Sequence, residues 1–451
     1  MTARPPLVPG SLLMGSVSDF RAGMLETCER ARRDHGDVVR FRVGPPGIGR
    51  ELYFVFHPDG AQRVLAGNAA NYRKDNVFYA EVRATFGDGL LTSQDDEWTR
   101  QKRFLQPLFT HRRVAGYAAT MGLQVEDMIR DWRAEPAAVR DLHDAMTRLT
   151  LRIVCRVLFG NDTQQALPVV KRWARPLGEA VRRRSMAPVR LPIGWPTPTN
   201  RRVTSAQRDL FGVCDAIIGD RRRSGSAGDQ DLLGLLVDAR DSGAGLSDVE
   251  VRDQVLIFLL AGHETTSTAL TFALDLLARH PEVQERVRAE VDAVGGVPTA
   301  EQAATLGYTE MVVKEAMRLF PSAPLTGRRS VADDEIGGFL IPAGSDVIVA
   351  PWVTQRHPAY WDEPERFDPE RFTSERERAR HRYAWFPFGG GPRACIGQHF
   401  SMLEATIALA GLVQNFEFAG GGDAPGYTNN VTLRPSGPVP VLVQPRRIRA
   451  G

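Results

Sequence analysis

The most informative stretch of this chain is Phe388-Gly-Gly-Gly-Pro-Arg-Ala-Cys395-Ile-Gly397. Its glycines let the backbone come close to the cysteine that follows them. Backbone N–H groups aimed at the sulfur, together with the N-terminus of a following helix, favour a thiolate over a thiol. Phe388 can shield the sulfur from solvent, and Arg393 can pair with an anionic group of a ligand. We therefore interpret Cys395 as a metal ligand. The alternative is a glycine-rich turn before a helix that carries an inert core cysteine, and a phosphate-binding loop is disfavoured because no Gly-Lys-[Ser/Thr] follows.

The composition is that of an ordinary globular protein with a large core. The chain has 451 residues, of which 43% are hydrophobic and 25% charged, and its net charge is only +3. This charge gives no reason to expect a nucleic-acid partner. The four cysteines (Cys28, Cys155, Cys214 and Cys395) lie far apart, which disfavours a disulfide framework and favours a reducing compartment. Residues 1–20 contain neither a signal-peptide core nor a membrane span, so we expect a cytoplasmic protein without a membrane anchor.

Strand patterns cluster near both ends of the chain, and helix patterns fill the middle. The β-rich part is expected at about 38–60 and 325–350, with further strands at the C-terminus. The helical part is expected at about 95–320 and 395–415. We therefore predict a single domain over 1–451 of the mainly α (α+β) class, with a large helical part and a smaller, segregated sheet.

One long helix is expected in the middle of the core. Ser247 and Glu250 form a capping-box pattern, and the apolar run that follows ends at Pro281. This helix should have about 33 residues and a length of about 50 Å. Its middle, VLIFLLAG, is apolar on every face, which is typical of a helix through the centre of a large core.

The glycine-rich stretch resembles a known signature. FGGGPRACIG matches FxxGxRxCxG, the haem-binding signature of the cytochrome P450 family, at every fixed position. The resemblance implies the cytochrome P450 fold, haem b as the cofactor and Cys395 as the axial thiolate ligand of its iron. It also implies that Phe388, Arg393 and Gly397 belong to the cofactor-binding site, with Arg393 on a haem propionate.

Two further signatures of the family occur in the expected order. Glu315-Ala-Met-Arg318 resembles ExxR, and 364–372 resembles the meander segment that supplies a second arginine. The resemblance implies that Glu315, Arg318 and Arg371 form a buried ion network behind the haem, where arginine tolerates burial better than lysine. Taken alone, the ExxR spacing is only an ordinary i,i+3 ion pair.

Polar residues interrupt the long apolar helix in the sequence AGHETT, residues 261–266. Polar groups are expensive there unless they have a task. The resemblance implies oxygen activation, in which Ala261 and Gly262 make room at the haem face and the helix widens locally. Glu264 and Thr265 would then relay protons. The alternative is a bend caused by Ser/Thr side chains, with Glu264 held in an ion pair.

Further cofactor contacts are implied earlier in the chain. Trp98 to Lys102 resembles the family's WxxxR helix, whose Trp and Arg hold a haem propionate, but this chain has Lys102 at the position of the arginine. Either Lys102 donates as a point charge, or Arg103 or Arg100 takes its place. Arg328 resembles the second propionate-binding arginine of the family.

The resemblance also assigns the walls of the substrate pocket. They map to six apolar residues: Val77, Phe78, Phe258, Ala323, Leu325 and Val431. This lining has no obvious charged anchor, so we expect a small apolar substrate such as a terpene, a fatty chain or a polyketide. Each of these residues fits an ordinary core position equally well. Hydroxylation of a terpene in secondary metabolism is the hypothesis within this range.

Electrons are expected from a separate protein, because no flavin or nicotinamide fingerprint follows Cys395. The resemblance implies NAD(P)H-derived electrons, delivered to a monomer by a ferredoxin or flavodoxin with its reductase. A basic docking face is one interpretation of five residues that abundant arginine explains equally well: Arg100, Lys102, Arg103, Arg112 and Arg113. The predicted reaction is insertion of one atom of O₂ into the substrate. The alternatives are a peroxide-using or isomerising haem-thiolate enzyme, and a haem sensor or carrier without turnover.

Overall fold

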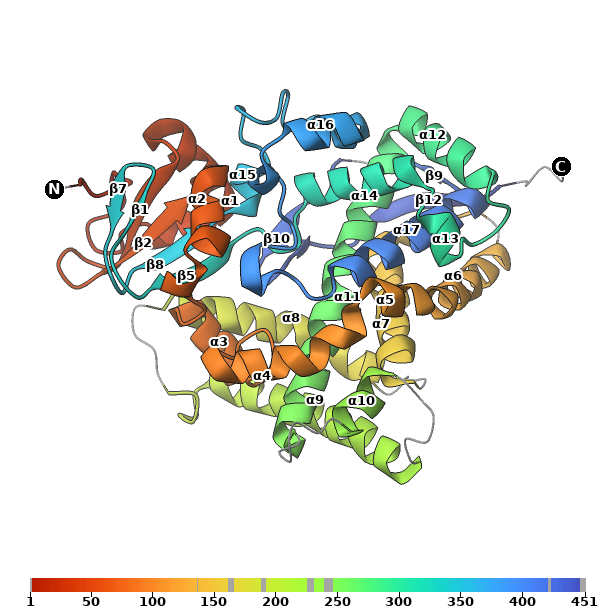
Figure 1. Ribbon diagram of the computed structural model, residues 1–451, viewed down its shortest axis with the longest axis horizontal. Helices are drawn as coiled ribbons and strands as arrows, with labels where there is room; N and C mark the ends of the chain where they lie inside the picture. The colour runs from red at the N-terminus through yellow and green to blue at the C-terminus, as the bar shows by residue number, and fades with distance from the viewer. Residues whose placement is uncertain are drawn as a thin grey trace.

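The structure, a computed structural model, has a β-rich part that carries the N-terminus and a larger helical part (Figure 1). It describes residues 2–135, 137–160, 166–187, 192–224, 231–238, 246–420 and 423–446. The α-helices are α1 (Val17–His35), α2 (Pro58–Gln62), α3 (Val77–Phe86), α4 (Asp95–Leu105), α5 (His111–Gly116), α6 (Ala118–Arg133), α7 (Leu142–Phe159), α8 (Ala166–Ser185), α9 (Pro198–Ser224), α10 (Leu232–Asp238), α11 (Asp248–Arg279), α12 (Pro281–Asp292), α13 (Ala300–Ala303), α14 (Gly307–Leu319), α15 (Pro351–Thr354), α16 (Ser374–Ala379) and α17 (Gln398–Asn415). The strands are β1 (Val38–Val43), β2 (Arg50–Val55), β3 (Tyr72–Arg73), β4 (Ala138–Asp141), β5 (Thr326–Ser330), β6 (Asp334–Ile336), β7 (Phe339–Ile341), β8 (Asp346–Val349), β9 (Phe416–Ala419), β10 (Tyr427–Asn429), β11 (Leu433–Pro435) and β12 (Pro440–Pro445). The predicted mainly α class with a segregated sheet is confirmed.

The largest sheet joins the two β-rich ranges that the sequence predicts. Its strand order is β1-β2-β8-β5-β3. β1 and β2 form an antiparallel hairpin, and β8 lies parallel to β2. In β1 the side chains of Val39, Phe41 and Val43 are buried, because alternate residues of a strand point to the same face. Residues from 38–60 and 325–350 therefore share one sheet and one apolar layer.

Several elements lie outside the ranges predicted for their type: α1, α2, α3, α15, α16, β3 and β4. α1 and α3 precede residue 95, and α1 buries Val17, Phe20, Cys28 and Ala31 along one helical stripe. β4 falls inside the predicted helical range, where it pairs with β12 in a sheet of order β4-β12-β9. A four-residue strand carries little local signal, since the partner that stabilises it is far away in the sequence.

α11 is the predicted central helix and has 32 residues. The capping box is confirmed, because the Ser247 hydroxyl accepts from the Glu250 N–H and the Glu250 carboxylate accepts from the Ser247 N–H. Among the described residues α11 is the one helix long and apolar enough to span a membrane, but 72% of that stretch is buried within the protein. α11 is α-helical along its whole length, so it does not show the local widening expected near Gly262.

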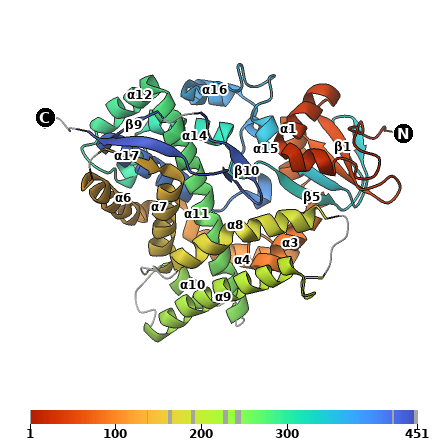
Figure 2. The same ribbon diagram turned by 180° about the vertical axis from the view of Figure 1, so that it is seen from behind.

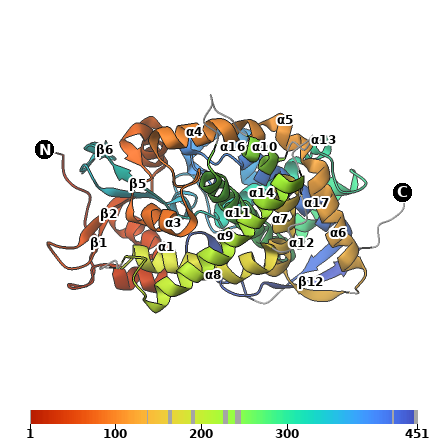
Figure 3. The same ribbon diagram turned by 90° about the horizontal axis from the view of Figure 1, so that it is seen from below.

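The other helices pack around α11. α8 and α9 lie on one side of it, and α12, α14 and α16 lie on the other, as both views show (Figures 1 and 2). Seen from below, α8 and α9 run across α11 (Figure 3). α7 and α17 contact α11 directly, and α17 begins just after Cys395. The fold therefore brings the cysteine loop to the middle of the central helix.

Candidate active site

A cavity of about 330 Å³ lies between the middle of α11 and the loop that carries Cys395. Most of the predicted site residues line it: Trp98, Lys102, Phe258, Ala261, Gly262, Thr265, Ala323, Arg328, Phe388, Arg393, Cys395 and Gly397. Other predicted residues are not part of this lining: Glu264, Val77, Phe78, Leu325 and Val431. Of these, Phe78, Leu325 and Val431 are partly buried residues that pack against the apolar core.

The loop before Cys395 can form only with glycine at certain positions. Gly391 has φ +64°, and a Cβ built on it would lie 1.9 Å from the carbonyl oxygen of Leu65. The Cys395 N–H donates to the Phe388 carbonyl at 2.8 Å, which closes the turn. Gly397 lies two residues after Cys395, and its N–H interacts with the cysteine sulfur. The glycine-rich sequence thus fixes where the sulfur points.

The thiol of Cys395 lies deep in the protein. Its side chain has accessible surface because it faces the cavity, whereas Cys28, Cys155 and Cys214 are buried. Burial raises the pKa of the Cys395 thiol, and the N–H of Gly397 opposes this effect. A metal cation at the sulfur displaces the thiol proton, because the thiolate is the ligand. Cys395 is therefore suited to a cation held inside the cavity.

Two cations lie over the indole ring of Trp98 at one end of the cavity. The Arg393 guanidinium is 4.2 Å from the ring centroid, and the Lys102 ammonium is 4.9 Å from it. Arg393 donates to the carbonyl oxygen of Ser93 at 2.5 Å, and Lys102 donates to that of Pro392 at 3.0 Å. Burial, followed by the nearby Arg328, lowers the pKa of Arg393 to about 10. Both cations are thus held by neutral groups.

Lys74 and Tyr79 belong to the same end of the cavity, and the sequence did not identify them. Burial lowers the pKa of Lys74 to about 8, and Arg328 and Arg393 add to this effect while Tyr79 opposes it. Burial alone would raise the pKa of Tyr79, but Lys74 and Arg328 lower it to about 8. Lys74 lies in the sequence NYRKDN, which has no recognisable pattern, so only the fold reveals this role.

These features fit a haem. Lys74, Lys102, Arg328 and Arg393 form no ion pair with a carboxylate in the described part of the chain. Cations without counter-charges are costly inside a protein, and the two propionates of haem b would bring two negative charges beside them. The thiolate of Cys395 would ligate the iron, and the walls that Phe109, Ile257 and Phe388 contribute suit the apolar ring. The site therefore defines a haem-thiolate protein.

The polar residues of α11 divide between the cavity and its surroundings. Thr265 faces the cavity, and its hydroxyl donates to the carbonyl oxygen of Ala261 at 2.9 Å. Glu264 instead forms an ion pair of 2.6 Å with Arg434 of β11, as the alternative interpretation of this stretch expected, although the sequence did not identify Arg434 as the partner. His263 is buried, its Nδ1 lies 2.5 Å from the carbonyl oxygen of Leu259, and burial lowers its pKa. The carboxylate of Glu264 is thus partnered in this conformation.

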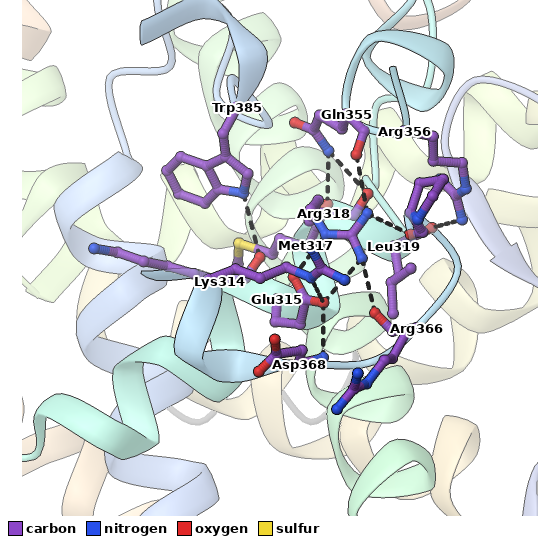
Figure 4. A network of polar contacts seen from close by, with 12 residues as sticks. Lys314, Glu315, Met317, Arg318, Leu319, Gln355, Arg356, Arg366, Asp368 and Trp385 are labelled. Atoms are coloured by element: carbon purple, nitrogen blue, oxygen red, sulfur yellow. Dashed lines mark hydrogen bonds and ion pairs between the residues drawn. The ribbon is translucent and has the colours of Figure 1, made fainter. Parts of the chain in front are cut away.

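A buried ion network lies behind the cysteine loop (Figure 4). Arg318 donates to both oxygens of Glu315, at 2.6 and 2.9 Å, and neither side chain is exposed to solvent. Arg371 lies 3.5 Å from Glu315. Burial raises the pKa of Glu315, and Arg318 opposes this effect. The structure thus brings the three network residues together.

Gln355 connects this network to the loop. Arg318 donates to the backbone carbonyl of Gln355 at 3.0 Å, and the side-chain oxygen of Gln355 accepts from the Phe386 N–H at 3.1 Å (Figure 4). Phe386 precedes the glycine-rich turn by two residues. The network therefore supports the start of the loop that positions Cys395.

Comparisons with known proteins agree with this site. The sequence profile of the family described as Cytochrome P450 matches residues 5–441. "Cyclooctat-9-en-7-ol 5-monooxygenase" from Streptomyces melanosporofaciens is 35% identical over 420 residues, which are 91% of this chain and 89% of that protein. "Pentalenene oxygenase" from Streptomyces avermitilis is 31% identical over 424 residues, 92% of this chain and 90% of that protein. The solved heme domain of "cytochrome P450DA" has a TM-score of 0.87 and 30% identity, and the likeness covers 99% of both chains.

The chain belongs to the cytochrome P450 family. It is a cytochrome P450 monooxygenase with a haem-thiolate iron cofactor, as the sequence predicted. The family match also extends to the N-terminal sheet and α1, which precede Trp98, where the first of the quoted signatures begins.

Proposed function

We propose that this monooxygenase hydroxylates an apolar terpene in secondary metabolism. The observation that carries the proposal is the lining of the cavity, where Phe258 stacks on Phe109 at 5.4 Å beside Leu90, Ile257 and Ala323. Apolar walls bind a hydrocarbon through buried area and shape, and the charged residues that also line this cavity are assigned to the cofactor. The relatives whose names mention cyclooctat-9-en-7-ol, cyclooctatin and pentalenene support a terpene.

Haem b would supply the oxidising chemistry, and the Cys395 thiolate would ligate its iron. Arg393, Lys102 and Arg328 would hold the propionates, and the ring of Trp98 supports Arg393 and Lys102. Ala261 and Gly262 leave space on the face of α11 that meets the cavity. These residues bind and orient the cofactor.

Proton delivery is assigned to Thr265 and Glu264. The Thr265 hydroxyl lies at the cavity wall, where it can pass a proton to a group inside the cavity. Glu264 exchanges a proton with it only after release from Arg434, because the carboxylate is bound to this arginine at 2.6 Å. Thr265→Ala should therefore divert NADPH-derived electrons from product into hydrogen peroxide.

The remaining assignments concern the partner and the location. A ferredoxin or flavodoxin with its reductase supplies the electrons to a monomeric protein in the cytoplasm. Arg112 and Arg113 support a basic docking face, since both line a groove of about 650 Å³ beside Tyr117. Arg100 is less available for docking, because its side chain is paired with Glu97 and Glu250.

The experiment is a substrate test on the haem-loaded protein with NADPH, a ferredoxin and its reductase. Cyclooctat-9-en-7-ol and pentalenene are compared with lauric acid by the shift of the haem absorption band and by product mass under ¹⁸O₂. We expect a terpene to shift the band and to gain one labelled oxygen, and Cys395→Ser to abolish both. A response to lauric acid alone would overturn the terpene assignment, and conversion with added peroxide but not with NADPH would favour the peroxide-using alternative.

A further inference from the structure

Three of the nine histidines lie together where the N-terminal β-rich part meets the segment before the cysteine loop. The rings of His57 and His357 are 5.6 Å apart, and the ring of Tyr360 lies 5.5 Å from the first and 5.6 Å from the second. The ring of His381 lies 6.1 Å from that of Tyr360. None of these four rings lines the cavity. Because histidine changes its charge between about pH 5 and 8, such a cluster responds to small changes in pH.

His57 and His381 each cap the start of a helical turn. His57 is the N-cap of α2, where its Nδ1 accepts from the N–H of Asp59 at 3.2 Å. His381 is the N-cap of a short 3₁₀ turn, where its Nδ1 accepts from the N–H of Tyr383 at 3.0 Å. Because Nδ1 is the acceptor, each neutral ring carries its hydrogen on Nε2. This hydrogen points to the Tyr360 hydroxyl at 3.1 Å in His57, and to the Asp59 carboxylate at 3.2 Å in His381.

The two caps hold segments that contact the glycine-rich loop before the predicted iron ligand. α2 leads into a helical turn whose Leu65 carbonyl occupies the place of a Cβ on Gly391. A Cβ built on Gly390 would overlap the ring of Tyr383. α2 also packs on the turn that His381 caps. The caps therefore support two consecutive glycines of the loop, each through a different segment.

A second proton on either ring breaks its cap. The proton can bind only to Nδ1, since Nε2 already carries a hydrogen, and the backbone N–H at Nδ1 then loses its acceptor. In His57 the added hydrogen can point instead to the Asp59 carboxylate, which lies 3.5 Å from Nδ1. The Asp59 side chain is 73% exposed, so water screens its attraction for either protonated ring. The lost caps therefore decide the effect of acid.

Further titratable groups face the two rings. His357 packs on His57, and its Nε2 lies 3.1 Å from the Asp37 carboxylate. The hydrogen bond from His357 lowers the pKa of Asp37, and His57 and Arg32 of α1 add to this effect. Burial raises the pKa of Tyr360, and nearby carboxylates add to this effect. The Asp37 carboxylate is thus partnered by His357, and the Tyr360 hydroxyl stays neutral in the range where histidine titrates.

We propose that His57 and His381 form an acid-sensitive latch, which holds the cysteine loop in place while both rings are neutral and releases it when they are protonated. The latch closes toward the alkaline end of the histidine range and opens toward its acidic end. Release of the loop loosens the position of Cys395, so acid should weaken the haem site. The inference does not depend on the terpene assignment, since neither ring lines the cavity.

The first test replaces both caps with asparagine, whose side-chain oxygen caps a helix but does not titrate. The thiolate absorption band of the reduced carbon monoxide complex is followed over time at about pH 7.5 and 5.5. We expect the band of the wild type to decay about tenfold faster at the lower pH, and that of His57→Asn/His381→Asn to decay at nearly the same rate at both. The control is His35→Asn, because His35 lies in the last turn of α1 rather than at a helix start. It should behave as the wild type, and an equal pH dependence in the double asparagine variant would overturn the proposal.

The second test removes the caps at every pH with His57→Ala/His381→Ala. Alanine accepts no backbone N–H, so we expect fast decay of the band at both pH values. Slow decay at about pH 7.5, as in the wild type, would mean that the caps do not hold the loop. The asparagine variant decides the question by itself if the alanine variant does not fold.

The third test locates the release by amide hydrogen exchange in the haem-loaded protein. Wild type and His57→Asn/His381→Asn are compared at the same pH, which removes the intrinsic pH dependence of exchange. At about pH 5.5 we expect residues 57–67 and 381–391 to exchange about tenfold faster in the wild type, with α12 unchanged. Equal exchange of the two segments in both proteins would sink the inference. Faster exchange that includes α12 would replace the latch by unfolding of the whole protein.

Discussion

Arginine side chains occur in two regions of this protein with opposite arrangements. Behind the cysteine loop, Arg318 donates to Glu315 and to three backbone carbonyls, so its charge and its hydrogens are satisfied by the chain itself. At the cavity, Arg328 and Arg393 donate only to neutral groups, and both lower the pKa of the nearby Lys74. The comparison teaches that a buried cation paired with a carboxylate of the chain supports the fold. Cations that lack such a carboxylate are instead paired by a ligand.

The largest effect is expected from breaking the complete network with Glu315→Gln. This change leaves Arg318 buried beside Arg371 without its carboxylate, which should cost about 3–5 kcal/mol of the free energy of unfolding. Urea unfolding of the haem-loaded protein measures the loss. The matched control is Glu363→Gln, because Glu363 and Arg366 form an exposed pair with the same i,i+3 spacing. This control should cost less than about 1 kcal/mol, and equal losses would mean that burial does not distinguish the two pairs.

The second largest effect is expected from a substitution in the glycine-rich loop before Cys395. In Gly391→Ala the left-handed φ alone costs about 1–2 kcal/mol, and the clash with the Leu65 carbonyl adds to this cost. We expect the purified variant to contain little haem, as read from its absorption after reduction under carbon monoxide. Gly389→Ala isolates the cost of the left-handed φ, since Gly389 has φ +71° and no atom within 4 Å of a built Cβ. The idea fails if both variants keep their haem equally well.

The two regions also differ in how well the sequence predicts them. Glu315, Arg318 and Cys395 stand in short signatures, because each is fixed by local backbone geometry or by a partner on the same helix turn. Lys74 and Arg434 carry no such signal, since Arg328 beside Lys74 and Glu264 beside Arg434 lie in distant segments that only the folded chain brings near.

Contacts between distant segments also limit how well the sequence predicts the pocket and the fold. Phe258 lines the cavity, and its neighbours on α11 form a recognisable motif. Val77 and Val431 come from regions whose path depends on long-range packing, and they do not line the cavity. Likewise β1 and β2 lie in the range 38–60 that the sequence predicted to be β-rich, but β4 depends on β12 far along the chain. Sequence patterns therefore predict local geometry, and the assembly of distant segments decides the rest.

The smallest effect, and the sharpest contrast, is expected from Lys74→Met. If Lys74 pairs with a haem propionate, the variant loses a charge-assisted hydrogen bond of about 1.5 kcal/mol and should lose haem roughly tenfold faster. Transfer of haem to excess apomyoglobin measures this rate. Lys171→Met is the control, because Lys171 pairs with Asp144 and does not line the cavity.

In the haem-free protein the sign of the Lys74→Met effect should reverse. The folded state lowers the pKa of Lys74 to about 8, below its unfolded value of about 10.4, so the folded chain binds fewer protons between these values. The charge therefore destabilises the fold below about pH 8, and this penalty disappears as the pH rises through the unfolded pKa. Urea unfolding of the haem-free protein should show Lys74→Met more stable than wild type near pH 7, with a smaller advantage near pH 9.5. Destabilisation of the haem-free protein by this variant would mean that Lys74 is satisfied within the chain, like Arg318, and the contrast between the two regions would not hold.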